Sequence, residues 1–255
     1  MKFLKPFLVL TFFATSILLI GTGCDDDDKA ADIAKIEFNF NYNVNGATYN
    51  AGDIYMINGT AVSFDLANFY IGGIEFQPET GNPISVNGLH LLVNSDQHEF
   101  NIAEVGAGQY SMLKFFVGVG LEENNQSEED FTVRTAGDPL AAQDPSMAWP
   151  WGAGYKFARI DGMVDTDADG VPDTGMQFHI GDPDPTDQDP KFRKSLEFDL
   201  SNDLVVGDNI LEINVDLALF FQDIDLSTNF ITHVGDNVDL ANTFFSNFDK
   251  AFSVN

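Results

Sequence analysis

Apolar side chains recur at every second position in six segments of the chain, which is the period of strands with one buried face. The six rows are Ile36, Phe38, Phe40, Tyr42, Val44; Val62, Phe64, Leu66; Leu113, Phe115, Val117, Val119; Met176, Phe178, Ile180; Leu196, Phe198, Leu200; and Leu211, Ile213, Val215, Leu217, Leu219. Turn-forming residues separate the rows, and no helical pattern lies between them. The chain is therefore expected to be all-β, with antiparallel sheets packed as a β-sandwich.

One segment near the C-terminus has a helical period. Its apolar residues are spaced three and four apart, at Val238, Ala241, Phe245, Phe248 and Phe252. That spacing places them on one side of a short α-helix, which we expect to close the sandwich. The 24 phenylalanines favour a core built mainly from aromatic packing.

A long polar segment interrupts the strand pattern from Glu122 to Met147. Loops of this length in compact domains are usually functional or disordered. We find no linker or internal repeat elsewhere, so residues 34–255 are expected to form one domain.

The N-terminus has the layout of a bacterial lipoprotein signal. Lys2 and Lys5 precede an apolar stretch, and small residues lead to Cys24, the chain's only cysteine. We expect residues 1–23 to be a signal peptide and Cys24 to be lipidated. The alternative is cleavage to a protein without an anchor that keeps one free thiol.

The segment 24–33 is expected to be an acidic tether. Its run from Asp25 to Asp28 resembles signals that send some lipoproteins to the cell surface, and a plain hydrophilic spacer fits it as well. The expected location is the cell envelope, with the lipid anchor in the outer membrane and the domain periplasmic or surface-exposed.

The charge balance narrows the partners. The chain has 40 acidic and 12 basic residues and a formal net charge of −28, so it should repel nucleic acid and attract cations. It contains no GxSxG elbow, phosphate-binding loop or HExxH helix, and we expect no enzymatic activity.

The most specific metal motif is an acidic loop of the form DxDxDGxxD at residues 165–173. The expected calcium ligands are the side chains of Asp165, Asp167, Asp169 and Asp173 and the backbone carbonyl of Val171. Position 12 of this loop is Met176 where an EF-hand has Glu, so a further ligand is expected from Asp182 or Asp184. The alternative is a solvated acidic turn without an ion.

The segment Met147–Phe157 reads MAWPWGAGYKF and resembles the MxWxWxxGYKF signature of the MbnP-like copper-binding family. Phe69–Ile74, Leu113–Gly120 and Phe178–Gly181 resemble further segments of that family in the same order. The motif residues are Trp149, Trp151, Gly154 and Tyr155. The resemblance implies an exported β-sandwich that binds copper through histidines. In some members a tryptophan beside the site is oxidised by a di-haem, peroxidase-like partner enzyme.

Carried over residue by residue, the resemblance makes His179 of the FHIG box the expected copper ligand. The family's first strand often has a histidine where this chain has Tyr42, so a second ligand must come from His90, His98 or His233. His90 lies in a row that resembles a family segment, and we take it as the second candidate. The alternative is that this chain keeps the fold and has lost the copper site.

Two functions of different class follow. The first is an exported, lipid-anchored copper-binding protein with a structural calcium loop. The second is a calcium-stabilised surface module that recognises protein or glycan through Trp149, Trp151 and the long polar segment.

Overall fold

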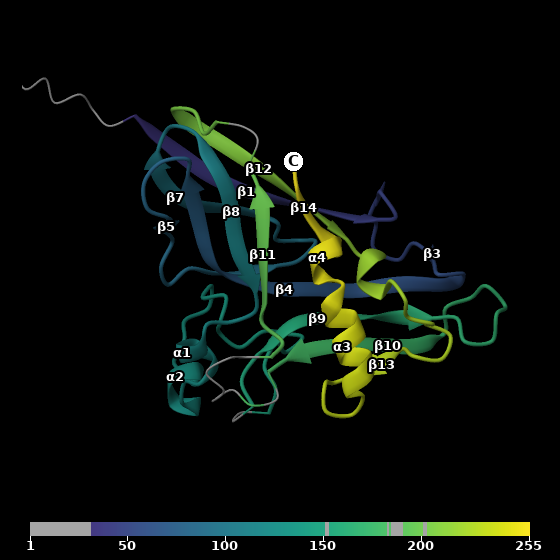
Figure 1. Ribbon diagram of the computed structural model, residues 1–255. Coiled ribbons are helices and arrows are strands. Elements are labelled where there is room, and N and C mark those ends of the chain that lie inside the picture. Colours follow the sequence, from purple (N-terminus) through teal and green to yellow (C-terminus); the bar gives the residue numbers. More distant parts are fainter. Residues whose placement is uncertain (1–31, 151–152, 183, 185–190, 201–202) are drawn as a thin grey trace, which may run out of the picture. The chain divides into compact units, whose positions relative to one another are not determined.

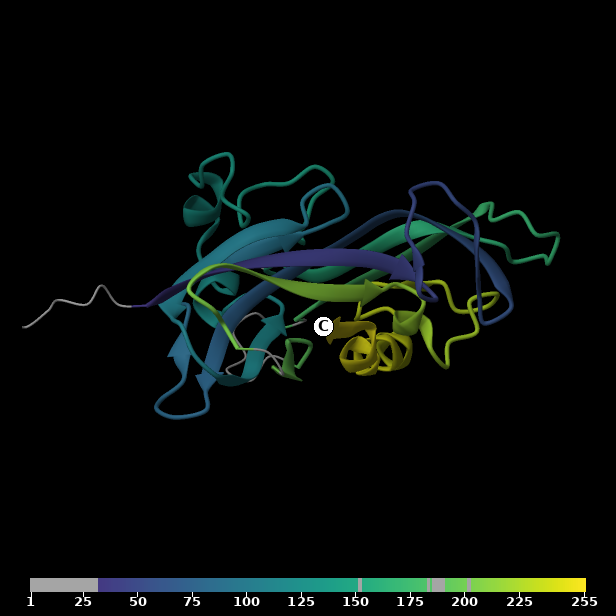
Figure 2. The ribbon, with the colours of Figure 1, turned by 90° about the horizontal axis from the view of Figure 1, so that it is seen from above.

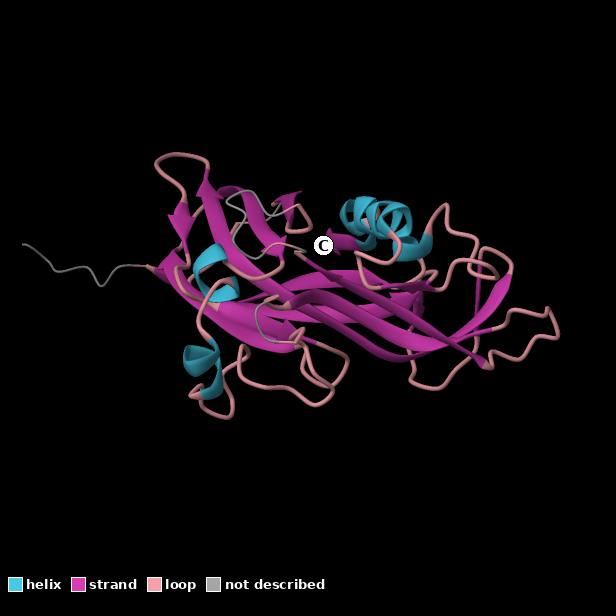
Figure 3. Ribbon diagram, turned by 90° about the horizontal axis from the view of Figure 1, so that it is seen from below, coloured by secondary structure: helices cyan, strands magenta, loops and turns pink. Residues whose placement is uncertain are grey.

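The alternating rows build two sheets that pack face to face. The computed structural model describes residues 32–150, 153–182, 184, 191–200 and 203–255. The predicted signal peptide, Cys24, most of the acidic tether and Trp151 lie outside these residues. Residues 32–255 form one compact unit, and strands make up most of its regular structure (Figure 3).

The smaller sheet is built around the long first strand. It contains β1 (Ile33–Val44), β2 (Ala47–Thr48), β7 (Glu99–Gly106), β12 (Gly207–Asp216) and β14 (Phe252–Val254). β12 runs parallel to β1, with Phe38 beside Leu211 and Phe40 beside Ile213. Alternation predicts which face is buried but carries no strand direction, so this parallel pair could not be predicted from it.

The larger sheet is built around β4, a strand of 19 residues (Figure 1). It contains β3 (Tyr55–Ile57), β4 (Thr60–Pro78), β5 (Ile84–Ser85), β6 (His90–Val93), β8 (Tyr110–Val117), β9 (Lys156–Val164), β10 (Thr174–Gly181), β11 (Lys194–Asp199) and β13 (Ile231–Thr232). All its pairs are antiparallel except β10 with β13. The predicted all-β sandwich is confirmed.

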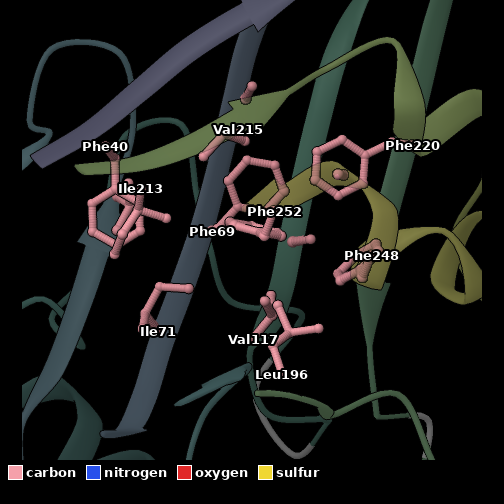
Figure 4. Close-up of a cluster of buried hydrophobic side chains, with 14 of the residues drawn as sticks. Phe40, Phe69, Ile71, Val117, Leu196, Ile213, Val215, Phe220, Phe248 and Phe252 are labelled. Carbon is pink, nitrogen blue, oxygen red and sulfur yellow. The ribbon is translucent and has the colours of Figure 1, made fainter. Parts of the chain in front are cut away.

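Aromatic rings fill the space between the sheets, as the composition predicts. Figure 4 shows Phe40, Ile213 and Val215 from the smaller sheet facing Phe69, Ile71 and Val117 from the larger one. The ring of Phe220 lies at the centre of a phenylalanine cluster, with centroids 5.1 Å from Phe69, 5.6 Å from Phe244, 5.0 Å from Phe248 and 5.7 Å from Phe252. Phe220 belongs to the short helix η1 (Leu219–Phe221) that follows β12.

The predicted C-terminal helix is present but is broken once. It consists of α3 (Val238–Ser246) and α4 (Phe248–Ala251). Asn247 separates them because its side chain is buried and donates hydrogen bonds to the carbonyls of Phe220 and Gln222. The face directed into the core carries Leu240, Ala241 and Phe244. Val238 is therefore exposed, contrary to the predicted face.

The long polar segment folds onto the outer face of the larger sheet. It contains α1 (Leu121–Asn124) and α2 (Glu128–Thr132), which lie on the opposite side of the strands from α3 and α4 (Figure 2). Leu140 and Met147 from this segment pack with Tyr70, Tyr155 and other residues in a second apolar cluster. No helix among the described residues is long and apolar enough to cross a membrane.

Replacing Phe220 by Ala should lower the free energy of unfolding by about 3–5 kcal/mol, because it leaves a cavity among closely packed rings. The neighbouring Leu219→Ala is the matched control. Leu219 is 36 % exposed, so its replacement should cost less than about 1 kcal/mol. Urea unfolding of both variants measures the difference, and equal losses would contradict this packing.

Candidate metal centre

The outer face of the β9–β10 hairpin carries a row of polar side chains. Arg159 and Asp161 on β9 face the same side as His179 and Gln177 on β10, with Arg159 opposite His179 and Asp161 opposite Gln177. Alternation predicts this outward direction for His179. The outward direction does not make the side chain accessible, because His179 is only 6 % exposed.

Asp161 determines which nitrogen of His179 carries a proton. His179 Nε2 lies 2.6 Å from Asp161 Oδ1, and Arg159 Nε donates to Asp161 Oδ2 at 2.8 Å. Burial acts to raise the pKa of Asp161, but His179 and Arg159 together hold it below its ordinary value. The ionised carboxylate only accepts hydrogen bonds, so the proton lies on Nε2 and the Nδ1 lone pair is left as a ligand.

The imidazole of His179 is neutral at neutral pH. Burial lowers its pKa, Asp161 raises it, and Arg159 and His233 lower it further, with a net shift downward. Neutral imidazole is the form that binds transition metals. His179 is therefore prepared as a metal ligand by its surroundings.

A second imidazole lies beside the first. The two-residue strand β13 runs parallel to β10, with Phe178 beside Thr232, so the next position in each strand brings His179 next to His233. The ring centroids are 4.8 Å apart. Sequence reasoning named His233 among possible partners without choosing it, because a strand of two residues has no visible period.

Asp236 orients His233 as Asp161 orients His179. Nδ1 of His233 lies 2.8 Å from Asp236 Oδ2, and the backbone N–H of His233 donates to Asp236 Oδ1 at 2.7 Å. Burial acts to raise the pKa of Asp236, yet its hydrogen bonds with His233 keep the pKa below its ordinary value. The carboxylate therefore accepts from Nδ1–H. Nε2, the remaining ring nitrogen, lies 3.2 Å from Gln177 Oε1.

Trp149 completes the centre from the polar segment. Its ring centroid lies 6.2 Å from that of His179 and 6.4 Å from that of His233. Lys156 holds this part of the segment, because its Nζ donates to the carbonyls of Ala148 (2.7 Å) and Ser146 (3.1 Å). The same ammonium lies 4.9 Å from the Trp149 ring centroid. Burial lowers the pKa of Lys156 to about 8.

Two glycines allow this close packing. Gly154 has a positive φ of 69°, and a Cβ there would collide with the amide of Asn124, which accepts a hydrogen bond from Tyr155 N. A Cβ on Gly181 would lie 2.7 Å from Trp149 Nε1. The glycines of the GYKF and FHIG motifs therefore bring the tryptophan onto the histidine pair.

The hydroxyl of Tyr155 holds the turn at Gly154 in place. It donates to the carbonyl of Leu140 at 2.7 Å and accepts from Gln126 Nε2 at 2.6 Å. Burial raises the pKa of this hydroxyl to about 12, so it stays neutral. Trp151, the other tryptophan of the motif, lies outside the described residues.

A small cavity opens beside the imidazole of His233. Its volume is about 260 Å³, and Trp149, Pro150, Gly181, His233 and Val234 are among its lining residues. It gives a small ion or molecule a place to approach His233, whereas His179 is not part of its lining.

His90 does not join the centre. His90 pairs with Gly72 of β4. His179 pairs with Arg159 of β9, and Arg159 in turn pairs with Asn68 of β4, which is four residues from Gly72. That separation is about 13 Å along β4, and His179 is also one strand further across the sheet. Nε2 of His90 accepts from the N–H of Gly120 at 3.1 Å. His90 thus has a local structural role.

The acidic loop forms the tip of the β9–β10 hairpin. Asp165 is 5 % exposed, and its carboxylate accepts from the N–H groups of Gly170 and Ala168, both at 2.8 Å, and of Asp167 at 3.2 Å. Burial acts to raise the pKa of Asp165, but these N–H groups hold it below its ordinary value. Asp165, Asp167 and Asp169 each offer an oxygen within 4.8 Å of the other two.

Of the other expected calcium ligands, Asp173 and Val171 belong to the exposed part of the same loop, whereas Asp182 and Asp184 lie elsewhere. Asp173 is exposed and its Oδ1 accepts from the hydroxyl of Thr174 at 3.3 Å. Val171 is 54 % exposed. Asp182 and Asp184 follow β10 at its far end, because Thr174 pairs with Val164 at the tip and Gly181 pairs with Lys156 at the base. The expectation that either would complete the loop is wrong.

The family comparison agrees with this architecture. The MbnP family profile matches residues 33–239. Among solved structures, MbnP from Methylosinus trichosporium superposes with a TM-score of 0.56 at 17 % identity, over 79 % of this chain and 82 % of that one. No curated protein matches the chain. The profile covers most of the described sandwich, and the chain belongs to the MbnP family.

Proposed function

We propose that this chain is an exported copper-binding protein, lipid-anchored through Cys24 in the outer membrane, in which His179 and His233 hold the metal. The acidic loop at residues 165–173 holds a structural calcium ion. The one observation that carries the copper proposal is the pairing of two imidazole rings 4.8 Å apart, each with a carboxylate on one nitrogen.

The donor set suits copper. Imidazole is a good ligand for copper, and a carboxylate on the second ring nitrogen fixes the tautomer and makes the ligating nitrogen more basic. His179 would ligate through Nδ1, because Asp161 occupies its Nε2, and His233 through Nε2, because Asp236 occupies its Nδ1. The side-chain amide of Gln177, whose Oε1 lies 3.2 Å from His233 Nε2, would have to turn away from that nitrogen. Copper supplies one-electron chemistry when bound.

Trp149 is an oxidisable side chain beside the proposed copper ligands. Its ring packs against both imidazoles, and the ammonium of Lys156 lies over it. A cation over the ring disfavours removal of an electron from the indole. Oxidation of Trp149 would therefore need a strong oxidant, which fits the di-haem, peroxidase-like partner that the family resemblance implies.

The acidic loop supports calcium binding in a specific way. Backbone N–H groups hold Asp165 in its ionised form, and the carboxylates of Asp167 and Asp169 lie close to it. Three carboxylates this close repel one another unless a cation neutralises them. An ion at the hairpin tip would fix β9 and β10 together, and this hairpin carries Asp161 and His179.

The second candidate function is surface recognition of protein or glycan. Trp149 is half-buried against the histidines and Lys156, and the polar segment packs on the sheet. Both observations favour the copper proposal over a free recognition surface at this place.

Removing either histidine should abolish stable copper binding. His179→Ala and His233→Ala each delete one of the two ligands, and Asp161→Asn should weaken copper binding about 10- to 100-fold by releasing the His179 tautomer. Copper content after loading and desalting, together with competition against a colorimetric chelator, measures these effects.

The control is His98→Ala, which removes an imidazole outside the centre and should leave copper content unchanged. His90→Ala should also leave it unchanged. Copper retained in both His179→Ala and His233→Ala, or copper lost in His90→Ala, would overturn the assignment of the ligands.

Calcium should raise the melting temperature of the protein. An ion at a hundredfold excess over its Kd stabilises the folded state by about 2.7 kcal/mol, which for a domain of this size corresponds to roughly 5–10 °C. Scanning calorimetry after EGTA treatment, with and without added calcium, measures the shift. Asp167→Asn and Asp169→Asn should remove most of it.

Asp223→Asn, an exposed acid of another loop, is the matched control and should keep the full shift. A melting temperature that does not respond to calcium in the wild-type protein would remove calcium from the account.

A further inference from the structure

A cavity lies on the smaller sheet where two successive strands leave a gap along β1. β7 pairs with β1 as far as Asn39, and β2 begins to pair at Asn43. β7 and β2 both pair with the same edge of β1, because β12 occupies the other edge of β1 along this stretch. Among the described residues, two backbone hydrogen bonds cross the gap, from Phe40 N to His98 O at 2.8 Å and from Tyr49 N to Tyr42 O at 3.1 Å. The gap opens into a cavity of about 430 Å³, within the range of small-molecule sites.

The lining of this cavity is neutral in a strongly acidic protein. None of its ten lining residues has a carboxylate or an amine, although the chain has 40 acidic residues. Of the nearby carboxylates, Asp65 and Asp96 act electrostatically on Tyr49, and two others are engaged in the sheet. Glu212 accepts from Asn39 Nδ2 (2.9 Å) and Asn41 Nδ2 (2.6 Å), and Asp216 accepts from Asn45 N (3.0 Å) and Gly46 N (3.1 Å). The lining therefore favours a ligand without charge.

Three asparagines supply hydrogen-bonding groups to the cavity. Asn41 lies beside Asn214 in the parallel ladder, and Asn43 follows on the same face of β1. The side chains of Asn43 and Asn214 make no hydrogen bond to any described residue. Asn41 uses its NH₂ group on Glu212, which leaves its carbonyl oxygen as an acceptor. Amides of this kind offer donors and acceptors together, as adjacent hydroxyl groups require.

His98 and Tyr49 add an acceptor and a flat apolar surface. His98 Nδ1 lies 3.2 Å from the carbonyl of Ser95, which only accepts, so Nδ1 is protonated and Nε2 is an acceptor. The ring of Tyr49 is held by its hydroxyl, which donates to Phe64 O at 3.2 Å, and by stacking on Tyr55 with centroids 6.3 Å apart. A fixed aromatic ring is a surface on which the C–H face of a sugar packs.

We propose that this cavity binds a neutral saccharide, with Asn41, Asn43, Asn214 and His98 as hydrogen-bonding residues and Tyr49 as the packing surface. A sugar supplies vicinal hydroxyls for the amides, an apolar ring face for the tyrosine and no charge. The site lies on the smaller sheet and shares no residue with the histidine pair, so it is independent of the proposed copper function.

Titration calorimetry of the whole mature protein with maltose, cellobiose and N,N′-diacetylchitobiose tests the proposal. At least one of these disaccharides should bind with a Kd of about 1 mM or tighter. Asn43→Ala and Asn214→Ala should each weaken that binding about tenfold, because each removes hydrogen bonds to hydroxyls. Melting curves that match the wild type show that these surface variants remain folded.

Asn101→Ala is the matched control, since Asn101 is an exposed amide on β7 outside the cavity, and it should bind as the wild type does. His179→Ala should also bind normally, which separates this site from copper. The proposal is overturned if none of the three sugars binds, if both cavity variants bind as the wild type does, or if Trp149→Ala abolishes binding while they do not.

Discussion

Two positions of a parallel ladder, Gln177 beside Ile231 and Phe178 beside Thr232, decide where the second imidazole of the proposed copper site lies. In parallel strands, residues at the same level point to the same face, so the next level brings His233 against His179. Thr232 is fully buried, and its hydroxyl donates to the carbonyl of Asn237, the residue that caps α3. The N-terminus of α3 therefore holds β13 in position, and β13 in turn determines the position of His233.

Burial and charge act together on the first imidazole. The polar segment covers the outer face of the hairpin, and Lys156 and Arg159 both donate to the carbonyl of Ser146, at 3.1 and 2.8 Å. Lys156 is buried and Arg159 is half-buried, and their hydrogen bonds hold the segment that carries Trp149 against the sheet. Asp161 balances Arg159 and fixes the His179 tautomer, so one carboxylate satisfies a cation and prepares a ligand. Asp161 and Asp236 therefore each hold one nitrogen of an imidazole, at 2.6 and 2.8 Å.

Much of the fold could be predicted from the sequence, because alternation reports directly which side chains are buried. The rows at Phe38 and Ile213 lie in the core as expected. Strand direction could not be predicted, since a period of two is the same in both directions. The break at Asn247 also escaped prediction, because it depends on carbonyls of η1 that are distant in sequence.

The candidate site could be predicted only in part. The resemblance of the FHIG box led to His179, and that of the WxWxxGYKF segment led to Trp149. His233 lies outside both motifs, and the signal that could have found it is an aspartate three residues later at the start of a helix, which holds the ring in place. His90 was favoured by a row that resembles a family segment, but strand register places it several residues away along β4. Register is a property of the folded sheet, and a single sequence does not report it.

The most direct test of the account is X-ray absorption spectroscopy of the copper-loaded protein, which counts the imidazole groups bound to the metal. The wild-type protein should show two imidazoles, and His233→Ala should show one or lose the metal. A wild-type spectrum with a single imidazole, or with none, would contradict the claim that the pairing of β13 with β10 builds the copper site.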